Sequence, residues 1–450
     1  KLVAYRRKAR AAGAANMPGT TVVGQRALVA LPTGTGKTVI FAQFPKMAAK
    51  KVLVIAHREE LLEQAAEKIR NANPSCVVGI EQAERHVEPG AQVVVASIQT
   101  LAVGKGRLDA LDPGQFSCVI VDEAHHATAL SYLKMLAHFG LAPDVSDLDQ
   151  DDIDRAAANA EVQRRFAEFR PLPSAPYLVG FTATPSRTDG RGLEGIFDDI
   201  VFSRTIREMM DAGWLCPIRG IQVKTASDIS DVKMHRGDFA QGDLGGKLAT
   251  PERNKQIAQA YLEHASGRRA LVFCVNVKHA QNVLEAFTQA GVRSVMVVGE
   301  TPPSERRLHV AAYKTGDVDV MVGVMVFTEG FDAPETSCVI MARPTKSSLV
   351  YTQAIGRGTR ISPGKVDLLV LDMVDISKRV QVQSLNTLFG LPPHLEIGTV
   401  GVTEAQDQVA KFVDAIPLEL FKTATSVADL ERMAKEFDPL AQTMLDGLLL

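Results

Sequence analysis

Four residues near the start of the chain can together hold a phosphate group. The segment "TGTGKT" places Gly34 and Gly36 where backbone amides can approach an anion with no Cβ in the way. Lys37 supplies a mobile cation, and Thr38 supplies a hydroxyl that can bind Mg²⁺. The strict form of such a loop has a further glycine five residues before Gly36, where this chain has Leu31.

The surroundings of this loop decide its interpretation. The stretch "ALVALPTGTGKTVIFAQF" (27–44) puts an apolar strand, a glycine-rich turn and a helix in that order. A glycine-rich turn before an ordinary helix would also contain these glycines. The strand–turn–helix order with Lys37 and Thr38 is, however, typical of a loop that cradles nucleotide phosphates. We therefore predict that this segment binds a nucleoside triphosphate together with Mg²⁺.

Two carboxylates and two histidines follow another apolar run, in "CVIVDEAHH" (118–126). Ligands of open α/β sheets gather at the carboxyl ends of the strands, so Asp122 should face the same crevice as the phosphate loop. We expect Asp122 to hold Mg²⁺ and Glu123 to orient or deprotonate an attacking water. A zinc cage is the alternative, but His138 brings no HxxxH or CxxC partner, and His126 receives no role.

Two arginines in the second half of the chain supply the cations that such a site needs. The segment "QAIGRGTR" (353–360) is expected to open a helix, so Arg357 and Arg360, spaced i, i+3, should project from one helical face. Two exposed arginines on a solvated helix would have the same spacing. Beside a phosphate loop and an acidic strand end, two guanidinium groups suit the charge that develops on a γ-phosphate.

Short apolar, β-branched runs alternate with amphipathic helices along the chain. In the first half the runs are "VLVIA" (52–56), "VVVA" (93–96), "CVIV" (118–121) and "YLVGF" (177–181), with a helical pattern over 58–70. In the second half they are "ALVFCV" (270–275), "SVMVV" (294–298), "VDVMVGV" (318–324), "CVIMA" (338–342) and "DLLVLD" (367–372), with a helical stretch at 278–290. Strands that are apolar throughout indicate a parallel sheet covered on both faces, so we predict an α/β protein with two such domains in tandem.

The remaining regions set the expected domain boundaries. The first domain is predicted over 1–220, with an acidic insert at about 140–176. The second is predicted over 221–380, and its first part, about 221–262, is expected to connect the domains because it is polar and rich in glycine. Residues 381–450 lack strand signals and are expected to form a small helical extension.

Composition limits the classes of protein that fit. A chain of 450 residues should form two or three domains. Its net charge of −2 argues against a protein that coats polyanions, although it allows a local basic groove. The five cysteines are scattered with no CxxC pair, which favours a reducing compartment. No apolar run is long enough to span a membrane and no secretory signal is visible, so we expect a cytoplasmic location, with an organelle or the nucleus left open.

Eight motifs occur in an order that resembles the superfamily 2 helicases and translocases. They are "LPTGTGKT", "AHREELLEQ", "ASIQT", "VDEAHH", "GFTATPSR", "LVFCVN", "TEGFDAP" and "QAIGRGTR". The chain looks like a DEAH-type member, most similar to the RadD, XPB and type I restriction-motor branch. The resemblance covers roughly residues 27–375. It implies two tandem RecA-like parallel-sheet domains followed by the small helical C-terminal extension.

The resemblance also implies roles for individual residues. The cofactors would be ATP and Mg²⁺, with Glu123 serving the hydrolytic water and Thr38 and Asp122 holding the metal. The residues implied to bind the nucleotide are Gly34, Thr35, Gly36, Lys37, Thr38, Asp122, His125, Gly330 and Asp332. Those implied to close over the phosphates from the second domain are Gln353, Arg357 and Arg360.

A further set of residues would connect the nucleotide to nucleic acid. The residues implied to track the nucleic-acid backbone are His57, Arg58, Gln99, Thr100 and Thr328. Those implied to couple the nucleotide state to domain movement are Thr182, Ala183 and Thr184. One departure concerns the element that recognises adenine in relatives, where Arg6 in "YRR" stands in place of the usual Gln.

These expectations combine into one hypothesis. The chain is expected to be an ATP-dependent motor on nucleic acid, with DNA favoured over RNA and a link to DNA repair or recombination. An RNA-dependent remodeller would share every motif. A motor or sensor subunit of a restriction or defence complex that does not unwind strands would share them too. A protein partner could bind through 381–450, and no membrane partner is expected.

Overall fold

The computed structural model describes most of the chain, and the described residues divide into two compact units. The described ranges are 25–103, 106–149, 152, 160–183, 193, 195–235, 237–328, 330–377, 382–397, 401–413 and 423–436. The first unit extends to Met209 and the second begins at Met210. None of the described helices is long and apolar enough to cross a membrane.

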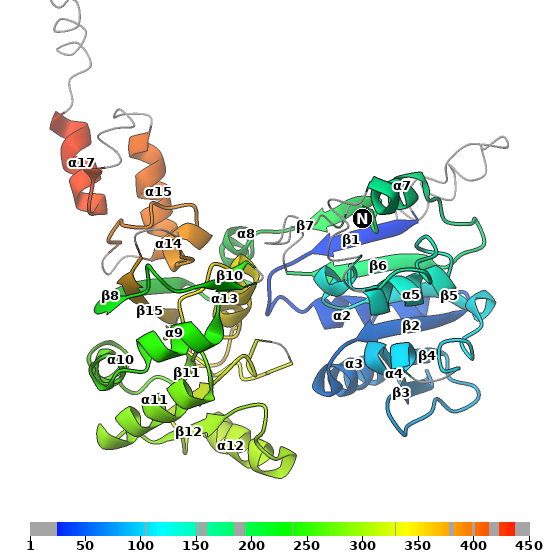
Figure 1. Cartoon of the computed structure of the whole chain (residues 1–450), viewed down its shortest axis with the longest axis horizontal. Helices are drawn as coiled ribbons and strands as arrows, with labels where there is room; N and C mark the ends of the chain where they lie inside the picture. The colour runs from blue at the N-terminus through cyan, green and yellow to red at the C-terminus, as the bar shows by residue number, and fades with distance from the viewer. Residues whose placement is uncertain are drawn as a thin grey trace, which may run out of the picture. The chain divides into compact units, whose positions relative to one another are not determined.

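The first unit is built on a seven-stranded parallel sheet in the order β3-β4-β2-β5-β6-β1-β7 (Figure 1). Its strands are β1 (Arg26–Ala30), β2 (Lys51–Ala56), β3 (Val78–Glu81), β4 (Val93–Ser97), β5 (Phe116–Val121), β6 (Tyr177–Thr182) and β7 (Asp199–Ser203). Its helices are α2 (Lys37–Phe41), α3 (Glu59–Ala72), α4 (Ile98–Val103), α5 (Leu130–His138), α7 (Ala160–Glu168) and α8 (Ile206–Asp211), with 3-10 turns η1 (Phe44–Met47), η2 (Pro113–Gln115) and η3 (Ala124–His126). Helix α8 runs across the division between the units.

Each face of this sheet carries its own hydrophobic core, which explains why the strands are apolar throughout. Successive residues of a strand point to opposite faces. Val54 packs in one core with Phe41 of α2 and Leu62 of α3. Its neighbour Leu53 packs in the other core with Leu133 of α5. The helices therefore cover both faces, as the uninterrupted apolar runs predicted.

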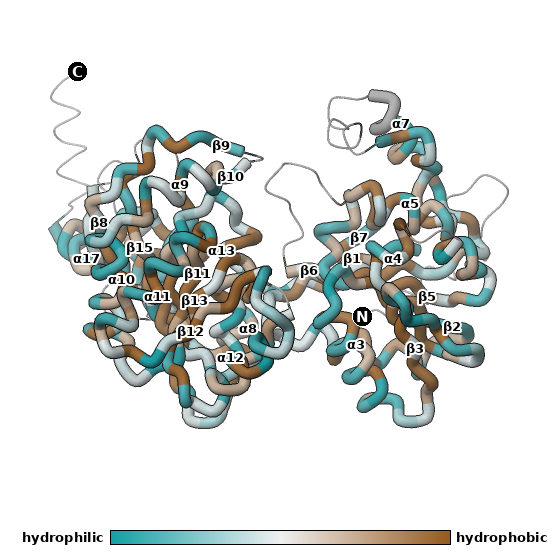
Figure 2. The backbone as a smooth tube through the Cα atoms, turned by 60° about the horizontal axis from the view of Figure 1, so that its bottom comes forward, coloured by the Kyte–Doolittle hydropathy of each residue, from teal (hydrophilic) through white to brown (hydrophobic). Residues whose placement is uncertain are grey.

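The second unit contains a six-stranded parallel sheet in the order β12-β13-β11-β14-β15-β8. Its strands are β8 (Ile218–Asp228), β11 (Ala270–Phe273), β12 (Ser294–Val297), β13 (Val320–Gly323), β14 (Cys338–Met341) and β15 (Leu368–Ile376). Its helices up to β15 are α9 (Gln241–Leu248), α10 (Pro251–His264), α11 (Val277–Gln289), α12 (Pro303–Thr315) and α13 (Ser348–Gly356). Hydrophobic residues follow the central strands β11 and β13 in the hydropathy colouring (Figure 2). Two parallel-sheet domains in tandem are thus confirmed.

The polar stretch expected to connect the domains is instead largely structured within the second unit. Strand β8 pairs in parallel with β15 along the edge of the sheet. A separate antiparallel ribbon follows, formed by β9 (Met234–His235) and β10 (Asp238–Phe239). The sequence did not reveal β8 because an edge strand is paired on one side only, and beyond its first residues β8 alternates half-buried with exposed positions.

The described part of 381–450 is helical and packs on this edge strand. It contains α14 (Leu385–Leu388), α15 (Val402–Val413) and α17 (Val427–Glu436). Gly401, just before α15, forms an isolated antiparallel bridge with Arg219 of β8. Gly220 of β8 lies so close to Leu385 that a Cβ at this position would collide with the leucine side chain. The extension is therefore anchored to the second sheet.

A glycine in β6 shows how tightly the first unit is built around the acidic motif. Gly180 is fully buried in the strand beside β5. A Cβ added to Gly180 would lie 2.8 Å from the Cβ of Ala124, which follows the two carboxylates, and it would also collide with the ring of Phe197. Only glycine lets the strand approach this turn so closely.

We predict that Gly180→Ala destabilises the first unit by about 1–3 kcal/mol, because the added methyl group would push Phe197 and Ala124 away from β6. The measurement is the opening free energy of β6 amides by hydrogen exchange. Gly246→Ala is the control, since Gly246 lies within α9 and a Cβ there meets nothing within 4 Å. Equal exchange of the β6 amides in both variants would show that the structure accommodates the methyl group added at Gly180 without cost.

Candidate active site

The phosphate loop has the backbone geometry that its glycines allow. Strand β1 ends at Ala30, and α2 begins at Lys37. Gly34 has φ 89° and Gly36 has φ 82°, in the left-handed region that other residues adopt at a cost. Nothing crowds Gly36, because a Cβ there would meet only Val39 at 3.9 Å. The need for glycine at position 36 is therefore set by the backbone conformation.

Leu31 replaces the first glycine of the strict pattern without disturbing the loop. Its amide donates to the carbonyl of Thr182 at 2.9 Å, so it continues the pairing of β1 with β6. Its side chain is buried in the core on one face of the sheet. The turn itself begins after this residue, and the Thr35 hydroxyl donates to the carbonyl of Pro32 at 2.7 Å.

The acidic motif begins where β5 ends. The Asp122 amide donates to the carbonyl of Ile55 at 3.0 Å, and the next residue turns sharply away from the sheet. Glu123 has φ 49° and ψ 54°, a left-handed conformation that costs a non-glycine residue about 1 kcal/mol or more. The surrounding core holds this turn, because Ala124 is fully buried between β6 and the helices that follow.

Lys37 and Glu123 meet at the carboxyl edge of the sheet. The Lys37 Nζ lies 3.7 Å from Glu123 Oε1, and both side chains are more than nine-tenths buried. Among the residues that the structure describes, this ammonium group has no hydrogen-bond partner. A buried ammonium without hydrogen bonds is costly, so the site fits an anionic ligand such as a nucleotide phosphate.

The carboxylates of the site outnumber the cation beside them. Burial, together with the neighbouring Glu123, raises the pKa of Asp122 to about 6, while Lys37 acts in the opposite direction. A divalent cation would supply the missing charge and favour the ionised carboxylate. The donor set of Asp122 with the half-buried Thr38 hydroxyl therefore fits Mg²⁺ that arrives with a nucleotide.

His125 links the acidic motif to the end of β6. Its Nδ1 lies 3.4 Å from Glu123 Oε2 and 3.4 Å from the Thr182 hydroxyl oxygen. Both His125 and Thr182 are buried. The structure thus brings together the first residue of the predicted coupling segment and the predicted catalytic glutamate. Ala183 follows directly, whereas Thr184 lies outside the described residues.

Three of the predicted nucleic-acid residues lie at the same edge of the first sheet. His57 follows β2, and Gln99 is in the first turn of α4 after β4. The Gln99 side-chain amide donates to the carbonyl of His57 at 2.7 Å, and the Ser97 hydroxyl donates to Gln99 Oε1 at 2.8 Å. Arg58 occupies the N-cap position of α3. These three residues, His57, Arg58 and Gln99, lie together at the surface. We call the set the His57–Gln99 segment, a name that refers to these residues and not to the range 57–99.

The other two nucleic-acid candidates make internal hydrogen bonds. The hydroxyl of Thr100 accepts a hydrogen bond from the Ala83 amide at 3.0 Å. In the second unit, Thr328 is 1% exposed, and its hydroxyl donates to the carbonyl of Met325 at 2.7 Å. Contact of Thr328 with nucleic acid would therefore require the loop that follows β13 to rearrange, and its role stays a prediction.

The arginine motif closes a helix instead of opening one. Helix α13 ends at Gly356, and Arg357 stands at its C-cap, so the shared helical face expected for Arg357 and Arg360 is wrong. The spacing i, i+3 fits a helix, but Gly356 and Gly358 weaken its continuation. The upstream end is fixed by Ser347, whose side chain accepts from the Val350 amide.

The two arginines nevertheless converge on one backbone carbonyl. Arg357 donates to the carbonyls of Phe331 at 2.9 Å and Thr328 at 2.6 Å, and it is 4% exposed. Arg360 donates to the same Phe331 carbonyl at 3.1 Å and to Asp332 Oδ1 at 2.9 Å. Together they fix the described residues of the loop 327–334, among which Gly330 has φ 75°. Gln353 is buried within α13.

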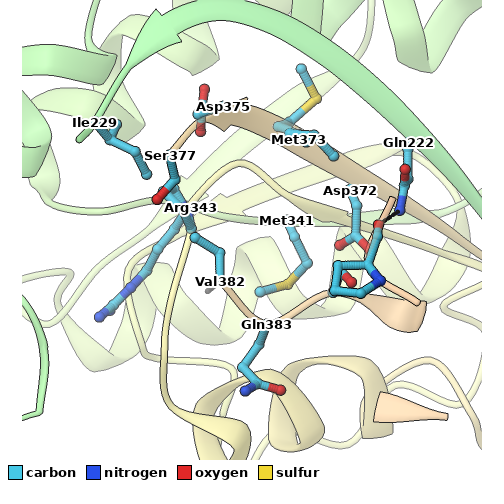
Figure 3. Close-up of a pocket in the computed structure, with 14 residues that line it drawn as sticks. Gln222, Ile229, Met341, Arg343, Asp372, Met373, Asp375, Ser377, Val382 and Gln383 are labelled. Atoms are coloured by element: carbon cyan, nitrogen blue, oxygen red, sulfur yellow. Dashed lines mark hydrogen bonds between the residues drawn. The ribbon is translucent and has the colours of Figure 1, made fainter. Parts of the chain in front are cut away.

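Sequence reasoning missed the residues that anchor α13. The Tyr351 hydroxyl lies 2.8 Å from both carboxylate oxygens of Asp372 on β15, and the Leu385 amide of α14 donates to Asp372 Oδ2 at 2.8 Å. Asp372 also borders a pocket of about 210 Å³, shared with side chains such as Met341 and Arg343 (Figure 3). The only hint in the sequence was the pair of aspartates, Asp372 and Asp375, within an otherwise apolar strand.

The histidine that raised the question of a zinc cage has a structural contact. A ring nitrogen of His138 lies 2.8 Å from the carbonyl of Leu111. In the part of the chain that the structure describes, no group of three or more His, Cys, Asp or Glu side chains is arranged to hold a metal ion. Arg6, the departure in the adenine element, lies outside the described residues.

Family models match both units of the chain. Residues 19–187 match the type III restriction enzyme res subunit, and residues 252–362 match the helicase conserved C-terminal domain. The chain therefore belongs to the superfamily 2 helicases and is similar to their restriction-motor members. This confirms the resemblance seen in the eight motifs.

Two curated yeast proteins and one solved structure illustrate the relationship. The chain is 33% identical over 377 residues to the putative ATP-dependent helicase IRC3 of Saccharomyces cerevisiae, covering 81% of this chain and 50% of that protein. It is 34% identical over 377 residues to the putative mitochondrial ATP-dependent helicase irc3 of Schizosaccharomyces pombe, covering 82% and 57%. The chain thus spans about half the length of these relatives.

The solved structure shares the fold. The ATP-dependent type ISP restriction-modification enzyme LlaBIII bound to DNA aligns with a TM-score of 0.54 and 16% identity, covering 85% of this chain and 28% of that one.

The anchor of α13 generates a prediction about pH. Burial raises the pKa of Asp372 from 3.8 to about 6, and the hydrogen bond from Tyr351 acts in the opposite direction. The folded unit therefore binds this proton more readily than the unfolded chain. The stability that this group contributes is complete below about pH 4 and is lost as the pH rises through about 6.

We predict that Tyr351→Phe lowers the unfolding free energy of the second unit more at pH 8 than at pH 5. At pH 8 the Tyr351 hydroxyl donates to an ionised Asp372, and losing this hydrogen bond costs about 1.5–3 kcal/mol. At pH 5 Asp372 is mostly neutral, and the loss costs about 1 kcal/mol. Urea unfolding at both pH values measures the difference. Tyr313→Phe is the matched control, because the Tyr313 hydroxyl pairs with the neutral Thr336 hydroxyl at 2.9 Å. An equal loss at both pH values in Tyr351→Phe would contradict this account of Asp372.

Proposed function

We propose that this chain is an ATP-driven motor that moves along DNA. The observation that carries the proposal is the buried Lys37–Glu123 pair at 3.7 Å, set between a glycine loop and Asp122 at one edge of the first sheet. Membership of the helicase superfamily supports the same conclusion.

Hydrolysis of ATP would divide among these residues. The loop from Gly34 to Thr38 binds the phosphates, and Lys37 neutralises charge that would otherwise oppose attack on the γ-phosphate. Mg²⁺ bound with the nucleotide supplies further positive charge at the phosphates. Glu123 orients the attacking water and accepts its proton, while its turn is held rigid by the packing of Ala124. A fixed carboxylate needs little reorganisation during reaction.

The second unit would contribute its arginines. Arg357 is buried and uses its guanidinium on two carbonyls, so we assign it to positioning the loop 327–334. The Arg360 side chain is 21% exposed and keeps more of its surface accessible, so we assign the contact with phosphate to Arg360. Gln353 is assigned to the same task by resemblance alone.

Nucleic acid would bind at the His57–Gln99 segment. This segment follows the carboxyl ends of β2 and β4, at the edge where Asp122 and Glu123 follow β5. Backbone contacts without base contacts suit a motor, because stepping must not depend on sequence. DNA is favoured because the first unit matches the model of a restriction enzyme subunit, and LlaBIII, a restriction-modification enzyme of the same fold, is solved bound to DNA. A role in DNA repair or recombination, and the compartment in which it occurs, belong to the same proposal.

We predict that Lys37→Ala abolishes nucleic-acid-stimulated ATP hydrolysis, with a loss of about a hundredfold or more, because the developing charge loses its fixed cation. Steady-state phosphate release measures the loss. The control is Lys46→Ala, since Lys46 is an exposed lysine shortly after the same loop. Normal turnover in Lys37→Ala would sink the assignment of the ATPase site.

Glu123→Gln should separate binding from chemistry. The amide keeps the shape of the side chain but cannot take a proton, so we expect nucleotide to bind with little loss of affinity while turnover falls by about 10²-fold or more. Equilibrium binding of a fluorescent ATP analogue and single-turnover hydrolysis measure the two steps. If the variant turns over at the parental rate, another residue activates the water.

The choice of nucleic acid is tested with the unaltered chain. Duplex DNA, single-stranded DNA and RNA are compared as stimulators of ATP hydrolysis at several salt concentrations, since contacts with phosphates weaken as salt rises. Strand displacement is measured in parallel. Preferential stimulation by RNA would replace the DNA assignment, and stimulation without displacement would indicate a translocase or sensor.

A further inference from the structure

Three histidine rings lie in a row at the carboxyl edge of the first sheet. The ring centroids of His57 and His126 are 4.6 Å apart with an interplanar angle of 59°, and those of His126 and His125 are 4.2 Å apart at 44°. His57 follows β2, whereas His125 and His126 belong to the turn η3 after β5. Because β2 and β5 are paired neighbours, their ends lie side by side.

The row has a chemically different neighbour at each end. At one end, His125 Nδ1 lies 3.4 Å from Glu123 Oε2. At the other end, the carbonyl of His57 accepts the side-chain amide of Gln99 at 2.7 Å. A continuous series of contacts therefore leads from the proposed water-activating carboxylate to the proposed nucleic-acid segment.

His126 is the middle member of this row, and its backbone is tied to the same turn as Glu123. The His126 amide donates to the Glu123 carbonyl at 3.0 Å, and the Ala129 amide donates to the His126 carbonyl at 2.9 Å. Glu123 occupies a left-handed conformation that depends on its surroundings. A displacement of the His126 ring is therefore transmitted to the turn that sets the Glu123 side chain.

The contacts between the three rings make this link stiff. Flat rings at these separations are in van der Waals contact, and packed groups of this kind transmit displacement because they cannot be compressed. Nucleic acid bound at the His57–Gln99 segment would move or fix the His57 ring, and this change would reach His126 through the ring contact. The contact of His125 with Thr182 is a separate link and is not needed for this path.

We propose that His126 is a positioning residue that couples nucleic-acid binding at the His57–Gln99 segment to the orientation of Glu123. This inference rests on the proposed function, because it assumes that Glu123 activates water and that nucleic acid stimulates the reaction. Neither the sequence motifs nor the family match assigns His126 a role. The effect is carried by the shape of the ring, and hence by its tilted contacts with the rings on either side.

The test compares His126→Ala, His126→Phe and the control His86→Ala. His86 is a histidine of the same unit whose side chain is 68% exposed. ATP hydrolysis is measured without nucleic acid and with saturating duplex or single-stranded DNA, and DNA affinity is measured by fluorescence anisotropy. The quantity of interest is the ratio of stimulated to basal turnover.

We expect His126→Ala to lower this ratio by about fivefold or more, which is the range of a typical coupling between sites, while DNA affinity changes by less than about threefold. His126→Phe should restore most of the ratio, because a flat ring again fills the gap between His57 and His125. His86→Ala should behave like the parent chain.

Two results would overturn the inference. The ratio of stimulated to basal turnover could stay unchanged in His126→Ala, including the case in which both rates fall in parallel, or the ratio could fall equally in the phenylalanine variant. The parent chain distinguishes failure of the His126 inference from failure of the proposed function. If ATP hydrolysis by the parent chain responds to no nucleic acid, the proposed function and the coupling role of His126 are both wrong. If the parent is stimulated and His126→Ala is stimulated equally, only the coupling role is lost.

Discussion

The first unit depends on holding buried charges at the carboxyl edge of its sheet. Lys37 directly follows the glycine loop as the first residue of α2, and Asp122 and Glu123 directly follow β5. Two carboxylates share one ammonium group in a place that water hardly reaches. Burial, together with the neighbouring Glu123, raises the pKa of Asp122. Within the described part of the chain, the Lys37 ammonium has no hydrogen-bond partner. A nucleotide with its cation would supply both missing partners, so the fold prepares a site that a ligand completes.

Backbone strain is the cost of that preparation. Gly34 and Gly36 accept left-handed conformations easily, whereas Glu123 does so against its preference. The surrounding packing compensates, because Gly180 allows β6 to approach Ala124. The backbone hydrogen bonds of η3 also close the turn, with the His126 amide 3.0 Å from the Glu123 carbonyl. In the second unit, hydrogen bonds from side chains hold a loop in place. Arg357 and Arg360 both donate to the Phe331 carbonyl of the loop 327–334.

The sequence predicted the features that depend on local pattern. Leu53 and Val54 belong to a run buried on both faces, and such a run indicates a central parallel strand whatever surrounds it. The glycines and Lys37 of the phosphate loop are equally local. Strand β8 was not predicted, because an edge strand is only half-buried and its polar residues resemble a linker. The end of α13 was not predicted either, because spacing i, i+3 is the same in a helix and in the turn that ends it.

Long-range contacts were the least predictable part and explain how the extension beyond β15 relates to the site. Asp372 accepts from Tyr351 on α13 and from the first amide of α14, so one carboxylate joins the arginine-bearing helix to the extension. Leu385, which carries that amide, also packs against Gly220 of the edge strand. Without α14, Asp372 would lose an amide donor and β8 would lose a covering side chain. The first helix of the extension is thus part of the structure that holds α13 and its terminal arginine in place, and its packing affects the loop 327–334 through Arg357.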